Sequence, residues 1–249
     1  MKIDRPLWAA GALLCPQQFQ QQARWEAWTN ERLAQLTLAH PWGVQAVEFD
    51  PQALRLGKLK ATRLRVRMPD GTWIDTEQVD RLPLALELAQ LLADDDQEAL
   101  LHLALPLEQA NGNNCLFEGG RVDRPMRYRQ SWREVQDIYA DEVQSISVLE
   151  HALSLRLHSD DNADYLTCPV ARLVRDGQGA WSLDPAYVPP LLSFAAHAGL
   201  LNQLDNLLTQ LSAKRQRLMG MRRESNQRMA DFAVADVSAH EVTGVPMNA

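Results

Sequence analysis

The spacing of apolar residues changes at a proline-rich stretch around residues 185–190, and this change constrains the fold more than any other feature of the chain. Before it, apolar and polar residues alternate in short runs, which is typical of strands with one face on a core. After it, leucines recur at steps of three and four residues, which is typical of a helix. The sequence therefore predicts an α+β protein with a β-rich domain over residues 1–184, a helical segment over residues 185–238 and a loose tail at residues 239–249.

The clearest predicted strand covers residues 61–68, where apolar side chains alternate with arginines. One face would lie on the core and the other in solvent. We expect the arginines to pair with acidic residues such as Asp75 and Glu77, although three cations on one face also fit a phosphate-binding surface. A turn at residues 69–71 would follow, because proline fixes φ and glycine accepts a positive φ. The apolar residues are Leu64, Val66 and Met68, and the arginines are Arg63, Arg65 and Arg67.

Further short β segments follow, separated by turns rich in aspartate, asparagine and glycine. A doubly wound α/β domain would need helices of about 10–15 residues between strands, so this pattern favours a β-sandwich. A hairpin is expected at residues 170–183, around Asp-Gly-Gln-Gly, and a short helix at residues 25–38. The other predicted β segments are residues 44–57, 82–92, 99–107, 115–117, 126–135 and 146–157.

The helical segment carries an unbroken heptad pattern. Arg215, Arg222 and Ser225 fall on the apolar seam and would weaken it unless other groups pair them. We expect one long helix over residues 191–237, or two helices that meet near Gly199. Such a helix has little to bury against within the β-rich domain, which predicts oligomerisation. The leucines that would form the contact are Leu201, Leu204, Leu208, Leu211 and Leu218.

The N-terminal stretch at residues 8–25 places apolar residues beside several glutamines and a proline. Pro16 lacks an N–H and disfavours helix at the preceding residue, so an extended arm would turn into a helix near Gln17. Neutral amides suit repeated hydrogen bonds to a partner backbone. The stretch therefore predicts either a protein contact or a segment buried in the chain's own core.

Two blocks of sequence resemble one known family. The first begins as Gly11-Ala12-Leu13-Leu14-Cys15-Pro16-Gln17-Gln18-Phe19-Gln20-Gln21. It is followed along the chain by Pro41-Trp42-Gly43 and by Gly57. The second is Asp184-Pro185-Ala186-Tyr187-Val188-Pro189-Pro190-Leu191-Leu192. The blocks lie far apart and in the expected order, and the chain resembles TssK, the baseplate adaptor of bacterial type VI secretion systems. The resemblance covers the first 238 residues or so, which would be just over half of a full family member.

The resemblance implies a structural adaptor without catalytic activity. Its β-rich shoulder, akin to the shoulder of tailed-phage receptor-binding proteins, would attach to the wedge proteins TssF and TssG. Its helical neck would form a homotrimer. A C-terminal head, which this chain would lack, would reach the membrane-complex proteins TssL and TssM. We expect Leu13, Leu14, Pro16 and Phe19 to contribute to a protein contact or to the shoulder core.

Composition and charge narrow the class of protein. The formal net charge of −7 argues against nucleic-acid binding, which needs clustered positive charge. The N-terminus lacks the pattern of a secretory signal, and no apolar run reaches the length of about 18 residues that spans a bilayer, so we expect a cytoplasmic protein. The resemblance to TssK implies in addition that it is peripheral to the inner membrane through the secretion apparatus. The three cysteines are widely spaced and fit buried, reduced thiols. We expect no metal and no cofactor.

Other functions remain open from the residues alone. The basic run at residues 214–223 fits a helix surface paired with a neighbouring acidic helix, an acidic partner or anionic lipid, with nucleic acid third. A carbohydrate- or nucleotide-processing β-domain would need two converging carboxylates, which no spacing supports. A carbohydrate-binding sandwich would expose several of the seven tryptophans as a platform, but we expect most of them in the core.

Overall fold

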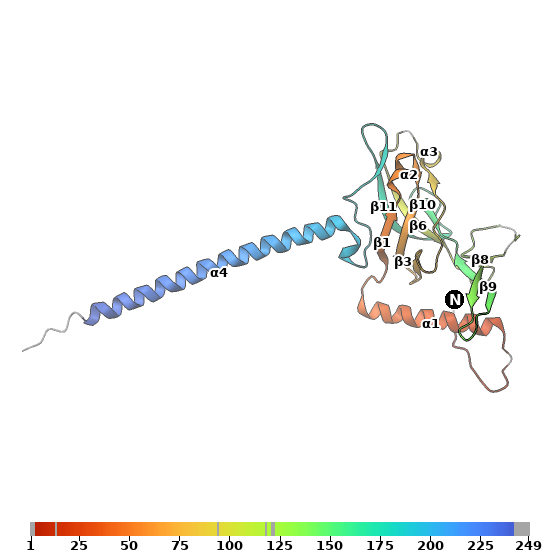
Figure 1. Cartoon of the computed structure of the whole chain (residues 1–249), viewed down its shortest axis with the longest axis horizontal. Coiled ribbons are helices and arrows are strands. Elements are labelled where there is room, and N and C mark those ends of the chain that lie inside the picture. Colours follow the sequence, from red (N-terminus) through yellow and green to blue (C-terminus); the bar gives the residue numbers. More distant parts are fainter. Residues whose placement is uncertain (1–2, 13, 94, 118, 121–122, 242–249) are drawn as a thin grey trace, which may run out of the picture. The chain divides into compact units, whose positions relative to one another are not determined.

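The computed structural model describes residues 3–12, 14–93, 95–117, 119–120 and 123–241, with no side chains described after residue 229. The chain divides into two units, Met1–His197 and Ala198–Ala249. The first unit holds every strand of the described chain, and the second is one long helix, so the protein is of the α+β class (Figure 1). The division falls 13 residues beyond the predicted boundary at residue 184, since 197 − 184 = 13.

Two antiparallel sheets form the centre of the first unit (Figure 1). The smaller sheet has the order β1-β3-β4, and the larger sheet has the order β10-β6-β11-β12. Their strands are β1 (Gly43–Phe49), β3 (Ala61–Arg67), β4 (Trp73–Asp75), β6 (Glu98–Pro106), β10 (Ser154–Leu157), β11 (Tyr165–Arg175) and β12 (Trp181–Leu183).

Side chains from both of these sheets form one hydrophobic core. The alternation predicted for β3 is confirmed, because Leu64, Val66 and Met68 are fully buried. From the larger sheet, Leu101 and Leu155 belong to the same cluster of buried side chains. Fully burying a leucine stabilises a fold by about 1.5–3 kcal/mol, so this shared core holds the two sheets in place.

Two hairpins appear where the sequence predicts them. The turn between β3 and β4 has Gly71 at φ +88°, and the turn between β11 and β12 has Gly179 at φ +85°. Strand β11 begins five residues before its predicted start at residue 170, as 170 − 165 = 5. A register shift between Pro169 and Ala171 explains this difference, because a bulge interrupts the period of two on which the prediction depends.

Three predicted β segments are wrong in part. Residues 51–55 form the helix α2 (Pro51–Arg55) rather than a strand, since Pro51 starts it and the Asp50 carboxylate accepts hydrogen bonds from two backbone N–H groups. Residues 82–92 hold only β5 (Leu86–Glu87), which pairs with β2 (Lys58–Leu59), and the short helix α3 (Leu88–Leu91). The predicted strand at residues 146–157 is two strands, which belong to different sheets.

The remaining strands form a third sheet of order β7-β8-β9, in which β8 and β9 make a long antiparallel hairpin. Its bounds are β7 (Cys115–Leu116), β8 (Tyr128–Gln136) and β9 (Val143–His151). Most residues of β8 and β9 away from the hairpin's base are exposed. The hairpin therefore adds little to the core of the first unit.

The long helix α4 (Ala198–Glu241) starts later and ends later than predicted. Residues 191–197 are not α-helical, because Leu192 N donates to Val44 O and a 3-10 turn, η1 (Phe194–Ala196), follows. Gly199 lies inside the first turn, and the helix is not broken there. Helix α4 continues three residues into the predicted tail, and residues 242–249 lie outside the described part of the chain.

Candidate protein-interaction surfaces

The N-terminal arm leads into helix α1 (Pro16–Thr37), which starts at the predicted proline. Cys15 is extended, and its N–H donates to the Gln18 side chain at 3.1 Å, so the helix begins with a reciprocal cap. None of the 22 residues of α1, all of which are described, is buried. A helix of this length with no buried residue depends on contacts that one copy of the first unit does not supply.

The predicted contact residues of this stretch are exposed where the structure describes them. Leu14 is 63% exposed and Phe19 is 57% exposed, while Pro16 is also exposed. Phe19 lies against Trp8 with ring centroids 5.7 Å apart. Leu13 lies outside the described residues. The alternative that this stretch is buried in the chain's own core is therefore wrong for the described residues.

A half-buried ion pair fixes α1 to the smaller sheet. Arg67 Nη2 of β3 lies 2.5 Å from Glu31 Oε2 of α1, and both side chains are 16% exposed. Arg67 also donates to the carbonyl of Pro41, which follows the helix. The glycine of the β3–β4 turn makes room for this pair, because a Cβ on Gly71 would lie 2.1 Å from Glu31 Oε2. The exposed residues of α1 are thus held in a defined orientation.

The two sequence blocks that resemble a known family meet in the structure. Val44 N donates to Pro190 O at 2.8 Å, and Leu192 N donates to Val44 O at 2.9 Å. Gly43 has φ +135°, and a Cβ there would lie 2.6 Å from Pro190 O. Glycine is required at residue 43 because the two backbones approach this closely.

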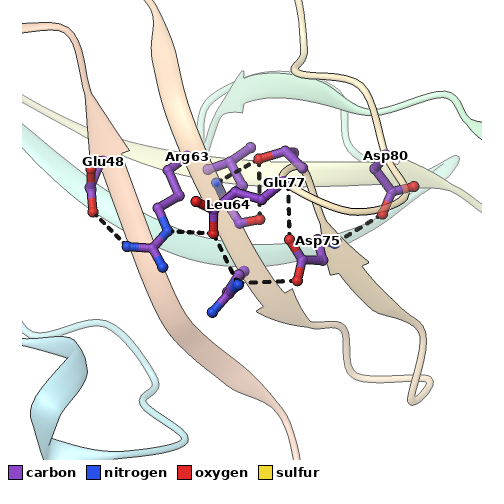
Figure 2. Close-up of polar contacts among 8 residues, drawn as sticks. Glu48, Arg63, Leu64, Asp75, Glu77 and Asp80 are labelled. Carbon is purple, nitrogen blue, oxygen red and sulfur yellow. Dashed lines mark hydrogen bonds and ion pairs between the residues drawn. The ribbon is translucent and has the colours of Figure 1, made fainter.

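The arginine face of β3 is a salt-bridge network, as predicted (Figure 2). Arg63 lies 3.1 Å from Glu48 and 2.9 Å from Glu77, and Arg65 lies 3.1 Å from Asp75 and 3.0 Å from Glu77. Hydrogen bonds to Glu48 and then Glu77 raise the pKa of Arg63 above its ordinary value. Each arginine already has carboxylate partners, so this face does not offer free cations to a phosphate.

Sequence reasoning missed a buried polar cluster at the base of the β8–β9 hairpin. The Asp80 carboxylate, 1% exposed, lies 2.8 Å from His151 Nδ1, and its other oxygen accepts from Asp75 N. Glu150, also buried, lies 2.9 Å from Arg81 and 2.8 Å from Arg133. These pairs attach the loop after β4 to the hairpin. No local pattern marks them, because the partners are far apart in the chain.

The far end of the same hairpin is a second surface that sequence reasoning missed. Ile138 is 93% exposed and Tyr139 is 97% exposed. Four of the seven tryptophans, Trp8, Trp28, Trp73 and Trp132, are exposed, and none of the seven is fully buried among the described residues. The prediction that most tryptophans lie in the core is therefore wrong. Two of these exposed tryptophans, Trp28 and Trp132, lie on faces of α1 and β8 that the first unit leaves exposed.

The predicted seam of α4 is also uncovered. None of the leucines at its heptad positions is buried in the described part of the helix. A shallow groove on the helix is lined by Leu211, Leu218, Met219 and the basic residues Lys214, Arg215 and Arg222. The positions concerned are Leu201, Leu204, Leu208, Leu211 and Leu218.

The described residues contain few groups that could form a metal site or a catalytic site. No three His, Cys, Asp or Glu side chains converge among the described residues. A second shallow groove, between the arm and α1, contains one carboxylate, that of Asp4. Within the same described residues, no helix is long and apolar enough to cross a membrane. Cys168 is buried, and burial raises its pKa to about 12, whereas Cys15 and Cys115 are only half-buried, contrary to prediction.

Extensive exposed apolar surface on α1, the β8–β9 hairpin and α4 defines a protein that functions by assembling with others. The family described as bacterial type VI secretion, which includes VasE, ImpJ and EvfL, matches residues 18–242. The chain belongs to this family, and it is a TssK-type baseplate component of the type VI secretion system.

Individual relatives agree with this assignment. The baseplate component TssK1 of Pseudomonas aeruginosa is 30% identical over 221 residues, which are 87% of this chain and 48% of that protein. A cryo-electron microscopy structure of a TssK–TssF–TssG baseplate subcomplex contains a chain that is 49% identical, with a TM-score of 0.84, over 89% of this chain and 73% of that one. A baseplate complex contains another at 52% identity and a TM-score of 0.85, over 96% of this chain and 53% of that one. The chain thus spans about half the length of the curated relative it matches.

Proposed function

We propose that this chain is the shoulder and part of the neck of a TssK adaptor, which links a TssF–TssG wedge to the membrane complex of the secretion system. The observation that carries this proposal is the 49% identity to a chain of a TssK–TssF–TssG subcomplex, over 89% of this chain. The adaptor acts through protein contacts, without catalysis or a cofactor. It works in the cytoplasm, peripheral to the inner membrane, and reaches TssL and TssM through a C-terminal head outside this sequence.

The shoulder is a β-sandwich, of the kind found in phage receptor-binding proteins, over residues 1–184. Two sheets that share one hydrophobic core support this proposal. The neck covers residues 185–238. Its α-helical part begins only at Ala198, after the segment that hydrogen-bonds to β1.

The wedge-binding surface includes the N-terminal end of α1, with Leu14, Pro16 and Phe19. These side chains are exposed, while the helix that carries them is fixed by the Arg67–Glu31 pair. An exposed apolar group on a fixed helix loses little conformational entropy when a partner covers it. Leu13 belongs to the same motif in the sequence.

Co-purification tests this surface. Wild-type chain co-expressed with TssF and TssG is expected to capture both, and Phe19→Asp is expected to capture at least about tenfold less, because it places a charge in an apolar contact. Leu36→Asp is the matched control, since Leu36 is exposed on another face of the same helix. Equal capture by Phe19→Asp and wild type would exclude this site, and no capture by wild type would contradict the adaptor function.

The neck forms a parallel homotrimer through the heptad leucines of α4. A second and third copy are the natural cover for this face, because each buried leucine would contribute about 1.5–3 kcal/mol and one copy of the described helix buries none of them. Light scattering is expected to give three times the chain mass of 28.1 kDa. Leu204→Asp/Leu211→Asp is expected to give a monomer, and Asn206→Asp/Ala213→Asp, on the opposite face, a trimer. A monomeric wild type would overturn the trimer.

A further inference from the structure

Helix α4 carries a basic segment that has no acidic residue at the spacing of helix neighbours. Its five cations are exposed, and none of them has an aspartate or glutamate three or four residues before or after it. Side chains at these spacings are the neighbours on a helix surface. The cations are Lys214, Arg215, Arg217, Arg222 and Arg223.

Two of these cations lie on the apolar seam. Each heptad has two seam positions. Leu204, Leu211 and Leu218 occupy one of them in successive heptads, and Arg215 and Arg222 occupy the other. The groove on the helix confirms this neighbourhood, because Arg215 and Arg222 line it together with the leucines. A guanidinium in such a seam loses its hydration when the helices pair, which destabilises the pairing unless the charge is neutralised.

Neighbouring copies cannot supply the neutralising charge. In a parallel trimer, the positions that flank the seam are the ones that form ion pairs with the neighbouring helix. Around the two arginine layers these positions hold Lys214, Met219, Met221 and Asn226. None of them is acidic, and Lys214 adds positive charge. Three copies of each arginine would therefore face one another without a carboxylate.

We propose that the neck binds phosphate-type oxyanions on its axis, at the Arg215 and Arg222 layers, so that the anion is part of the trimer. This inference depends on the trimer proposed above. The guanidinium fork matches the oxygens of a phosphate, and three forks around one oxyanion neutralise each other's repulsion. Layers of Leu211 and Leu218 close the Arg215 layer above and below. A small anion fits this enclosure, whereas an acidic peptide or a lipid surface does not.

The test measures trimerisation of the 249-residue chain in inorganic phosphate and in chloride at equal ionic strength, by sedimentation equilibrium over a dilution series. With phosphate at ten times its Kd, mass action is expected to raise the trimerisation constant by about tenfold for each site. The phosphate response is expected to disappear in Arg215→Gln/Arg222→Gln. It is expected to remain in Arg217→Gln/Arg223→Gln, which removes the same charge off the seam.

The outcomes separate this inference from the proposed function. A trimer whose stability is the same in phosphate and chloride overturns the oxyanion site and leaves the neck trimer in place. Equal loss of the response in both double variants also overturns it, because the effect would then be general surface charge. A monomer in both salts overturns the trimer and this site together. Capture of the trimer by phosphatidylglycerol vesicles that persists in Arg217→Gln/Arg223→Gln but is lost in Arg215→Gln/Arg222→Gln would show that the seam arginines face outward, which contradicts the enclosed site.

Discussion

Replacing Gly43 by alanine tests the contact that joins the two family-typical sequence blocks. A Cβ at residue 43 would lie 2.6 Å from Pro190 O, and the backbone has φ +135°. Gly57 is the matched control, since it has φ +77° and nothing lies within 4 Å of a Cβ there. Both variants share the backbone strain of a positive φ, which costs about 1–3 kcal/mol.

Only Gly43→Ala adds a collision with backbone. Moving the Pro190 carbonyl away disrupts the hydrogen bond that it accepts from Val44 N at 2.8 Å. The same shift of the backbone disrupts the neighbouring bond from Leu192 N to Val44 O at 2.9 Å. Each contributes about 1 kcal/mol, so Gly43→Ala is expected to lose about 2 kcal/mol more than Gly57→Ala. For a unit of this size the difference corresponds to about 4–8 °C in Tm.

Tryptophan fluorescence during urea unfolding measures this difference well. All seven tryptophans lie within the first unit, so the signal reports that unit and not α4. The two variants are compared by the urea concentration at their unfolding midpoints, with the same dependence of the unfolding free energy on urea. Equal destabilisation by Gly43→Ala and Gly57→Ala would refute the reasoning, because it would leave the close approach to Pro190 without energetic weight.

Three further predictions concern single groups of the first unit. Arg67→Met is expected to speed amide hydrogen exchange throughout α1 with little change in β6, because the ion pair that fixes the helix is lost; unchanged exchange in α1 would contradict this. Burial raises the pKa of Asp70, but the charge of Arg127 and hydrogen bonds from Thr72 lower it by more. The pKa of Asp70 is therefore below its ordinary value. The stabilisation that ionised Asp70 contributes is therefore present above its unfolded-state pKa and is lost as pH falls through its folded-state pKa. Asp70→Asn is expected to weaken the fall in unfolding free energy between about pH 5 and pH 2, and an unchanged fall would refute this. Iodoacetamide at pH 8 is expected to modify half-buried Cys15 before Cys168, whose thiol stays protonated, and mass spectrometry would reveal the reverse order.

Much of the candidate surface was predictable because its evidence is local. The line of leucines along α4 follows from the heptad, and the start of α1 follows from Pro16. The pairing of Arg63 and Arg65 with carboxylates followed from strand alternation and one turn. In each case the residues involved lie within one element or one hairpin, where spacing alone fixes which side chains are neighbours.

The tryptophans show where this reasoning stops. An aromatic residue predicts burial, yet Trp28 and Trp132 are exposed because the first unit leaves their faces of α1 and β8 uncovered. The exposed hairpin end at Ile138 and Tyr139 was missed for the same reason. Apolar character says that a side chain is suited to burial, but not whether its cover comes from the same chain or from a partner.

The sequence by itself determined the class of fold, the change from strands to a long helix, the main hairpins and the family. These depend on periodicity and on short motifs, which are properties of neighbouring residues. Only the tertiary structure decided that Gly43 meets Pro190, that Glu31 on α1 pairs with Arg67, and that Asp80 pairs with His151 across 71 residues. Such contacts depend on how the sheets and their connections pack, and a local pattern carries no record of that arrangement.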